Sequence, residues 1–204
     1  MIGNAATSGP GAPDSGRLVK PGRWEDLSFD VLAISIPGGN NAPDPVLIPG
    51  TGLYIAGFPS IGITEVPISG KEYPHSAVLA GDGSQAIIKP HFHLQTTTTG
   101  TGNVYLQLEL RATRPGKTPL HTTVGVAFAP PSVAFTEEVI ITLPDIDISS
   151  VADGIGTQLT ARFFRDPGHA SDTFTGEVGV TTLGWHVLYD TQGSLEVMYK
   201  ESAP

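Results

Sequence analysis

The stretch AIIKPHFHLQTTTTGTGNVYLQLELRA, residues 86–112, decides the fold class. Apolar side chains occupy every second position in its first ten residues and again in its last ten. This period of two is the pattern of a β-strand with one buried face. The threonine- and glycine-rich residues 96–102 predict a turn between the two series. The stretch therefore predicts two amphipathic strands, 86–95 and 103–112, paired as a hairpin.

A proline interrupts the first of these strands. Pro90 has no N–H group and cannot donate a hydrogen bond to a neighbouring strand. Prolines within sheets are therefore found mainly on edge strands and at bulges. We expect the strand 86–95 to lie at the edge of a sheet or to be bulged.

The period of two continues through most of the chain and predicts an all-β fold. The 25 glycines and 18 prolines among 204 residues make turns frequent and long helices unfavourable. About ten short strands with long connections favour a two-sheet β-sandwich of jelly-roll type over residues 23–204. Residues 37–52 are expected to form a loop and 145–154 a short helical turn. The remaining expected strands are 29–36, 53–58, 62–69, 121–129, 137–144, 159–165, 176–189 and 194–200.

The first 22 residues differ in composition from the rest. They are rich in Gly, Pro, Ala and Ser, and such a segment buries too little apolar surface to fold alone. One interpretation is a disordered leader. The other is an extended N-terminal arm, residues 1–22, which could reach roughly 70 Å across a neighbouring subunit. No basic segment followed by an apolar one is present, so no signal peptide is predicted.

Charge and composition exclude several classes of function. The net charge is −9, from 20 acidic against 11 basic residues, and no run of Lys or Arg offers a surface for nucleic acid. The absence of cysteine excludes disulfides, thiol catalysis and cysteine-based zinc sites. No apolar run is long enough to span a membrane.

Two histidines on the strand 86–95 are the first candidate site. In a strand, His91 and His93 lie about 6.7 Å apart on one face. Three copies around a threefold axis would offer six imidazole nitrogens to Fe, Ni or Zn. Two other interpretations stay open: a metal-free trimer contact, and a polar face that bonds to Tyr105, Gln107 or Glu109 across the hairpin.

The enzyme motifs that the chain approaches are incomplete. A His-x-His strand in a jelly roll is similar to the cupins, but the position of the cupin glutamate falls within the threonines 96–99. The Gly-Lys-Thr at 116–118 has Arg111 where a phosphate-binding loop needs its first glycine. No Gly-x-Ser-x-Gly occurs. We therefore expect no enzymatic activity and no cofactor beyond a metal at an oligomer axis.

The segment RFFRDPGHASDTF, residues 162–174, is the second candidate. Arg165 and Asp166 are predicted to clamp the loop between two strands through charge-assisted hydrogen bonds.

Several short motifs, taken in order, resemble a family of bacteriophage virion structural proteins. The resemblance covers roughly residues 24–200 and runs from Pro-His through Pro-His-x-His, Gly-Asn-Val, Arg-x-x-Arg-Asp and Asp-Thr-aromatic to a late histidine strand and Asp-x-x-Gly-Ser. Leu94 stands where the family tends to have tryptophan. The positions that carry the pattern are His75, His91, His93, Asn103, Arg162, Arg165, Asp166, Asp172, His186 and Asp190.

This resemblance implies a location in the virion and a homotrimer. The chain would be a non-enzymatic capsid decoration or cement protein, or a head-surface projection. It would dock by its N-terminal arm and trimerise through its β domain, with the major capsid protein or other virion proteins as partners. The alternative is a receptor- or glycan-binding protein of a head or tail fibre, in which Tyr105 and Trp185 would stack on sugars.

Overall fold

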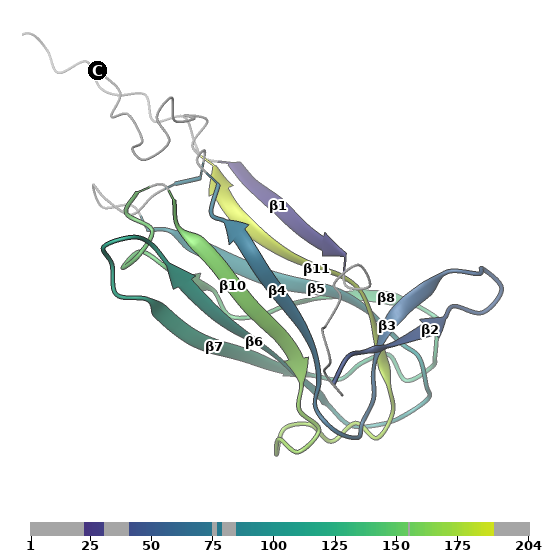
Figure 1. The fold of residues 1–204 in the computed structure, drawn as a ribbon. Helices are drawn as coiled ribbons and strands as arrows, with labels where there is room; N and C mark the ends of the chain where they lie inside the picture. Colours follow the sequence, from purple (N-terminus) through teal and green to yellow (C-terminus); the bar gives the residue numbers. More distant parts are fainter. Residues whose placement is uncertain (1–22, 31–40, 75–76, 79–84, 155, 190–204) are drawn as a thin grey trace, which may run out of the picture.

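The computed structural model describes residues 23–30, 41–74, 77–78, 85–154 and 156–189. These residues form eleven β-strands, and they contain no helix that could cross a membrane (Figure 1). The predicted arm, 1–22, lies outside the described residues, as do the expected strand 194–200 and residues 31–36 of the expected strand 29–36.

The strands form two antiparallel sheets. Sheet A has the order β2-β3-β11-β5-β8, with β1 paired to β11 and β9 paired to β5, and sheet B has the order β4-β10-β6-β7. Sheet A contains β1 (Arg23–Asp30), β2 (Asp44–Leu47), β3 (Tyr54–Phe58), β5 (Ile87–Thr96), β8 (Glu138–Thr142), β9 (Ile146–Asp147) and β11 (Val178–Tyr189). Sheet B contains β4 (Thr64–Glu72), β6 (Val104–Thr113), β7 (Leu120–Phe128) and β10 (Gln158–Arg165).

The core lies between the two sheets, where the alternating apolar side chains meet. Phe163 of sheet B packs against Phe58 and Phe92 of sheet A, with ring centroids 5.5 and 5.0 Å away. The apolar positions of β5 and β6 are fully buried in one cluster with them. The predicted all-β, two-sheet β-sandwich is therefore confirmed. Its jelly-roll type stays an interpretation, which the alternation of β3, β4, β5 and β6 between the sheets favours.

The predicted hairpin is wrong. β5 belongs to sheet A and β6 to sheet B, so the two strands lie in different layers and do not pair (Figure 1). Each strand still buries one apolar face, but it does so across the sandwich. Tyr105, Gln107 and Glu109 consequently belong to the other sheet from the two histidines of β5, which removes the predicted hydrogen bonds across a hairpin.

The edge position predicted for the strand of Pro90 is also wrong, because β5 lies inside sheet A. One side of β5 pairs with β11, and the other pairs first with β9 and then with β8. The carbonyl of Pro90 accepts a hydrogen bond from the N–H of Leu143, in the break between β8 and β9. The missing N–H of Pro90 faces this break, where no ladder bond is lost.

Two shorter elements were not expected. β2 lies in the segment predicted as a loop and pairs with β3, with Val46 opposite Ile55. Gly50 and Gly52, both with positive φ, turn the chain between these strands. β9 occupies the start of the segment 145–154, and a turn follows in which Val151 and Ala152 donate to the carbonyl of Ile148.

Candidate functional site

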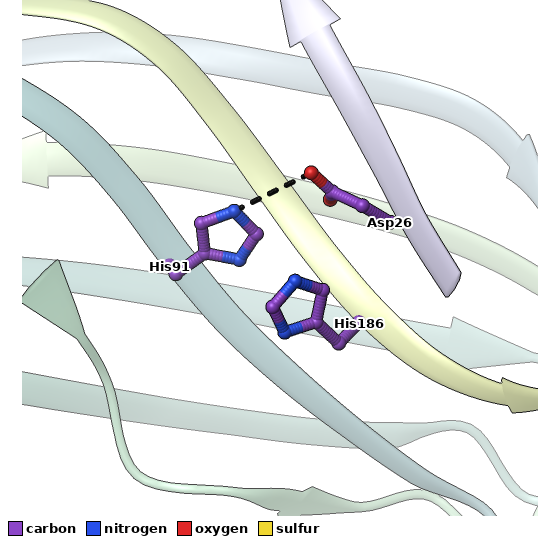
Figure 2. A group of neighbouring side chains, drawn as sticks. All are labelled: Asp26, His91 and His186. Carbon is purple, nitrogen blue, oxygen red and sulfur yellow. Dashed lines mark ion pairs between the residues drawn. The ribbon is translucent and has the colours of Figure 1, made fainter. Parts of the chain in front are cut away.

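Three strands of sheet A bring a carboxylate and two imidazoles together on the outer face of the sheet. Asp26 comes from β1, His91 from β5 and His186 from β11, and one potential metal-ligand atom from each lies within 4.8 Å of the others. Figure 2 shows the three side chains turned toward one another, with an ion pair between His91 and Asp26. We call these three residues the Asp-His-His cluster.

Gly184 allows side chains from β1 and β5 to meet across β11. Its β11 position pairs with His91 on one side and with Ser28 of β1 on the other. Strands two places apart in a sheet are separated by about 10 Å, so a side chain between them would block the contact. A Cβ at position 184 would lie 2.6 Å from Oδ1 of Asp26 and 2.7 Å from Nε2 of His91.

His91 is the buried member of the cluster, with 3% of its side chain exposed. Its Nε2 lies 3.6 Å from Oδ2 of Asp26, and its Nδ1 is buried without a hydrogen-bond partner. The ring of His186 stacks on it, with centroids 4.4 Å apart. Burial lowers the pKa of His91; Asp26 opposes this shift, while His186 and His93 reinforce it. The imidazole is therefore held in its neutral form at neutral pH.

His93 shares the outer face with His91, as the period of two predicts, but has different partners. The two ring centroids are 5.6 Å apart. Nδ1 of His93 lies 3.0 Å from Oε1 of Glu138, and the hydroxyl of Thr181 donates to the other oxygen of that carboxylate. Within the described residues, His91 thus belongs with Asp26 and His186, and His93 with Glu138. A metal on a threefold axis stays a prediction.

The predicted clamp on the loop 166–177 is formed by Arg165, but its acidic partner is Asp172 and not Asp166. The Arg165 side chain is fully buried and makes a bidentate pair with Asp172, with distances of 2.9 and 2.8 Å. It also donates to the carbonyls of Phe58, Phe174 and Gly176.

Asp166 has a more local role than predicted. Its Oδ1 accepts a hydrogen bond from the N–H of Gly168, which shapes the start of the loop. Asp166 directly follows the last residue of β10, and the guanidinium of Arg165 is occupied by Asp172 and by three backbone carbonyls.

The other pattern positions have structural partners or fall outside the described residues. The backbone carbonyl of Asn103 accepts hydrogen bonds from the N–H groups of Thr173 and Phe174, which ties the loop before β6 to the same segment. Arg162 pairs with Glu65 and Glu109 on the outer face of sheet B. His75 and Asp190 lie outside the described residues.

A second polar network occupies the outer face of sheet B. Glu109 accepts hydrogen bonds from Arg162 and lies 2.7 Å from Nε2 of His121. These contacts, with His121 first, lower the pKa of Glu109. An open pocket of about 230 Å³ lies beside the network, and its lining residues are Glu109, Arg111, His121, Thr160, Ala161 and Arg162.

The two aromatic residues expected to bind sugars are not exposed together. Trp185 is fully buried and packs against Phe29, with ring centroids 4.7 Å apart. It lies on the inner face of β11, one residue from the outward-facing His186. Tyr105 is half-buried and stacks on the ring of His169 at 3.8 Å.

Sequence reasoning missed Asp26 and placed His186 only as part of a motif pattern. The alternation of Leu27 and Phe29 with polar residues could have placed Asp26 on the outer face of β1. It could not have shown that β1 lies beside β11, because 160 positions of sequence separate Asp26 from His186, its partner in the strand pairing, and no local pattern predicts a pairing over that distance.

Comparisons with known proteins add little to this geometry. No protein-family model matches the chain, and no curated protein matches it. Among solved structures, a similar chain belongs to a structure of infectious bursal disease virus Gt strain, with 13% identity and a TM-score of 0.26. The similarity covers 84% of this chain and 54% of that chain, so the protein spans about half the length of the chain it matches. A likeness this weak carries no argument about function.

Proposed function

We propose that the protein is a non-enzymatic structural protein of a bacteriophage virion, either a decoration or cement protein or a projection on the head. Its β domain trimerises, and its N-terminal arm docks onto the major capsid protein or another virion protein. The proposal rests on the ordered motif pattern and on the part that the pattern residues play in the fold.

The observation that carries the proposal is the buried ion pair of Arg165 and Asp172. These two pattern positions join a strand to a loop through buried hydrogen bonds, as residues that maintain a scaffold do, and the backbone of the exposed Asn103 bonds to the same loop. A motif pattern made of scaffold residues favours a family that shares a structural role over one that shares a reaction.

The strand order supports the same proposal. We infer a jelly roll from the orders β3-β11-β5-β8 and β4-β10-β6-β7, in which all neighbouring strands except β6 and β7 are non-consecutive in sequence. Jelly rolls of two Greek keys occur in viral capsid domains, and also in lectins and cupins. The fold is therefore compatible with a virion role without being specific to it.

Deletion of residues 1–22 tests the arm and the trimer separately. We expect the truncated protein to fold and to remain a trimer by native mass spectrometry, because the β domain carries the trimer contact. We expect it to be lost from density-purified particles, as measured by quantitative proteomics against the full chain. Normal incorporation without residues 1–22 would refute docking by the arm, and a monomeric full chain would refute the trimer.

The glycan-binding alternative loses support from the burial of Trp185, one of its two named aromatic residues. Tyr105 alone, stacked on His169, offers a smaller platform for a sugar. Binding of the full chain to host surface polysaccharide, abolished by Tyr105→Ala, would favour this alternative.

A further inference from the structure

We propose that Asp26, His91 and His186 bind one divalent transition-metal ion of the zinc type within a single chain, and that the ion holds β1 against sheet A. This site differs from a metal shared by His91 and His93 of three chains. It needs no oligomer, and its residues come from three strands of one sandwich.

The donor set fits such an ion. Two imidazoles and one carboxylate are the protein ligands of many zinc sites in which solvent completes the coordination. The same set also binds non-haem iron. The ligand atoms already lie within 4.8 Å of one another. Small rotations of the half-exposed Asp26 and His186 side chains could bring them onto one ion.

The unpartnered nitrogen of His91 is the independent sign of a ligand. Buried polar atoms in proteins nearly always have a partner, and each exception calls for an explanation. Nδ1 of His91 has no hydrogen-bond partner, and only 3% of the side chain is exposed, so solvent does not replace the missing partner. Figure 2 shows this nitrogen on the side of the ring that faces His186. A shared ion would satisfy it.

The arrangement of Gly184 and β1 indicates what the ion would do. Among the described strands β1 pairs only with β11, while β11 pairs also with β5 and β3. A metal ion bound by both Asp26 and His91 would link β1 to β5, which lies on the other side of β11. The link would pass over Gly184, where no side chain stands in the way. Metal binding would therefore stabilise the strand that directly follows the N-terminal segment.

Metal titration of the untagged full chain tests the proposal. We expect Zn²⁺ to bind with one ion per chain by calorimetry and native mass spectrometry, and Co²⁺ to give the visible absorption of a bound ion. Asp26→Asn and His186→Gln should each weaken Zn²⁺ binding roughly tenfold or more. Loss of a residue that only hydrogen-bonds to a metal ligand already lowers the affinity by about that factor, and loss of the ligand itself should lower it at least as much. Both side chains are partly exposed, so both variants should fold, whereas variants of the buried His91 could fail to do so.

Two matched variants separate this site from its alternatives. His93→Gln and His121→Gln remove histidines outside the cluster and should leave the affinity and the stoichiometry unchanged. Hydrogen exchange provides a second readout: Zn²⁺ should slow exchange in residues 23–30 of the wild-type chain, and EDTA should reverse this.

Each other outcome overturns the proposal. Absence of binding would do so directly. One ion per three chains, lost in His93→Gln but kept in Asp26→Asn, would assign the metal to a threefold axis. Equal binding by all four variants would show adventitious surface binding.

Discussion

At Gly184 the protein has only a hydrogen atom where any other residue would carry a Cβ against Asp26 and His91. We predict that Gly184→Ala destabilises the fold by about 1–3 kcal/mol, the usual cost of inserting a methyl group into a packed site. Urea unfolding followed by the fluorescence of the buried Trp185 would measure the change. The same variant should lose the metal affinity of the Asp-His-His cluster.

Gly168→Ala is the matched control for this prediction. A Cβ at position 168 would meet one atom, Oδ1 of Asp166, at 3.2 Å, and that carboxylate can rotate. We expect a small change in the unfolding free energy. A loss at Gly184→Ala no larger than that at Gly168→Ala would contradict the role given to Gly184.

At the residue scale, the sequence predicts which face a side chain occupies better than which partner it meets. The outward direction of His91 and His93 followed from their spacing and is observed. The contacts of His91 with Asp26 and His186 depend on the pairing of β1 and β5 with β11. Such long-range pairings leave no local pattern, so the cluster could not be predicted from the sequence.

At the scale of the elements, the outer face of sheet B makes stability depend on pH. The pKa of Glu109 is lowered from its ordinary value of 4.5, first by His121 and then by Arg162. A carboxyl group whose pKa is lower in the folded state stabilises the fold above its unfolded pKa, and this contribution is lost as pH falls through the folded pKa.

We predict that Glu109→Gln lowers the unfolding free energy at pH 7 by about 1 kcal/mol or less, the range of partly exposed ion pairs. The difference from wild type should shrink below pH 4.5 or so, where the wild-type carboxylate is also protonated. Urea unfolding across pH 3 to 7 would measure it, with Glu137→Gln as the control. A difference that grows as pH falls would contradict the assigned sign.

The elements themselves were largely predictable, because period two and turn residues are local signals. β3, β4, β5, β6, β7, β8, β10 and β11 all overlap expected strands. The hairpin of β5 and β6 was wrong because two amphipathic strands joined by a short loop can bury their apolar faces side by side or across a sandwich. The sequence of residues 86–112 satisfies both arrangements.

At the scale of the whole molecule, Arg165 joins the two sheets at one end. Its guanidinium extends from β10 of sheet B to the carbonyl of Phe58 in β3 of sheet A, and it holds the loop that leads to β11 through Asp172. Asp172 in turn accepts a hydrogen bond from the N–H of Tyr105 in β6.

We predict that Arg165→Met destabilises the protein by about 3–5 kcal/mol, because it leaves the buried carboxylate of Asp172 without its cation. Arg162→Met is a matched change on the same strand, at a side chain that is 43% exposed, and should cost about 1 kcal/mol or less. Urea unfolding of both variants gives the comparison. Equal decreases in the unfolding free energy would show that the buried pair of Arg165 and Asp172 stabilises the fold no more than the exposed pairs of Arg162 do.

The break between β8 and β9 opposite Pro90 also restricts how the strands can align while the protein folds. If β8 slid along β5 to cover Pro90, one of its carbonyls would face a ring that has no hydrogen to give. A slide of one residue would, in addition, turn Val139 and Ile141 from the core toward solvent. Pro90 therefore makes shifted registers of β8 on β5 unfavourable, and the observed register is the one that keeps both the hydrogen bonds and the apolar face.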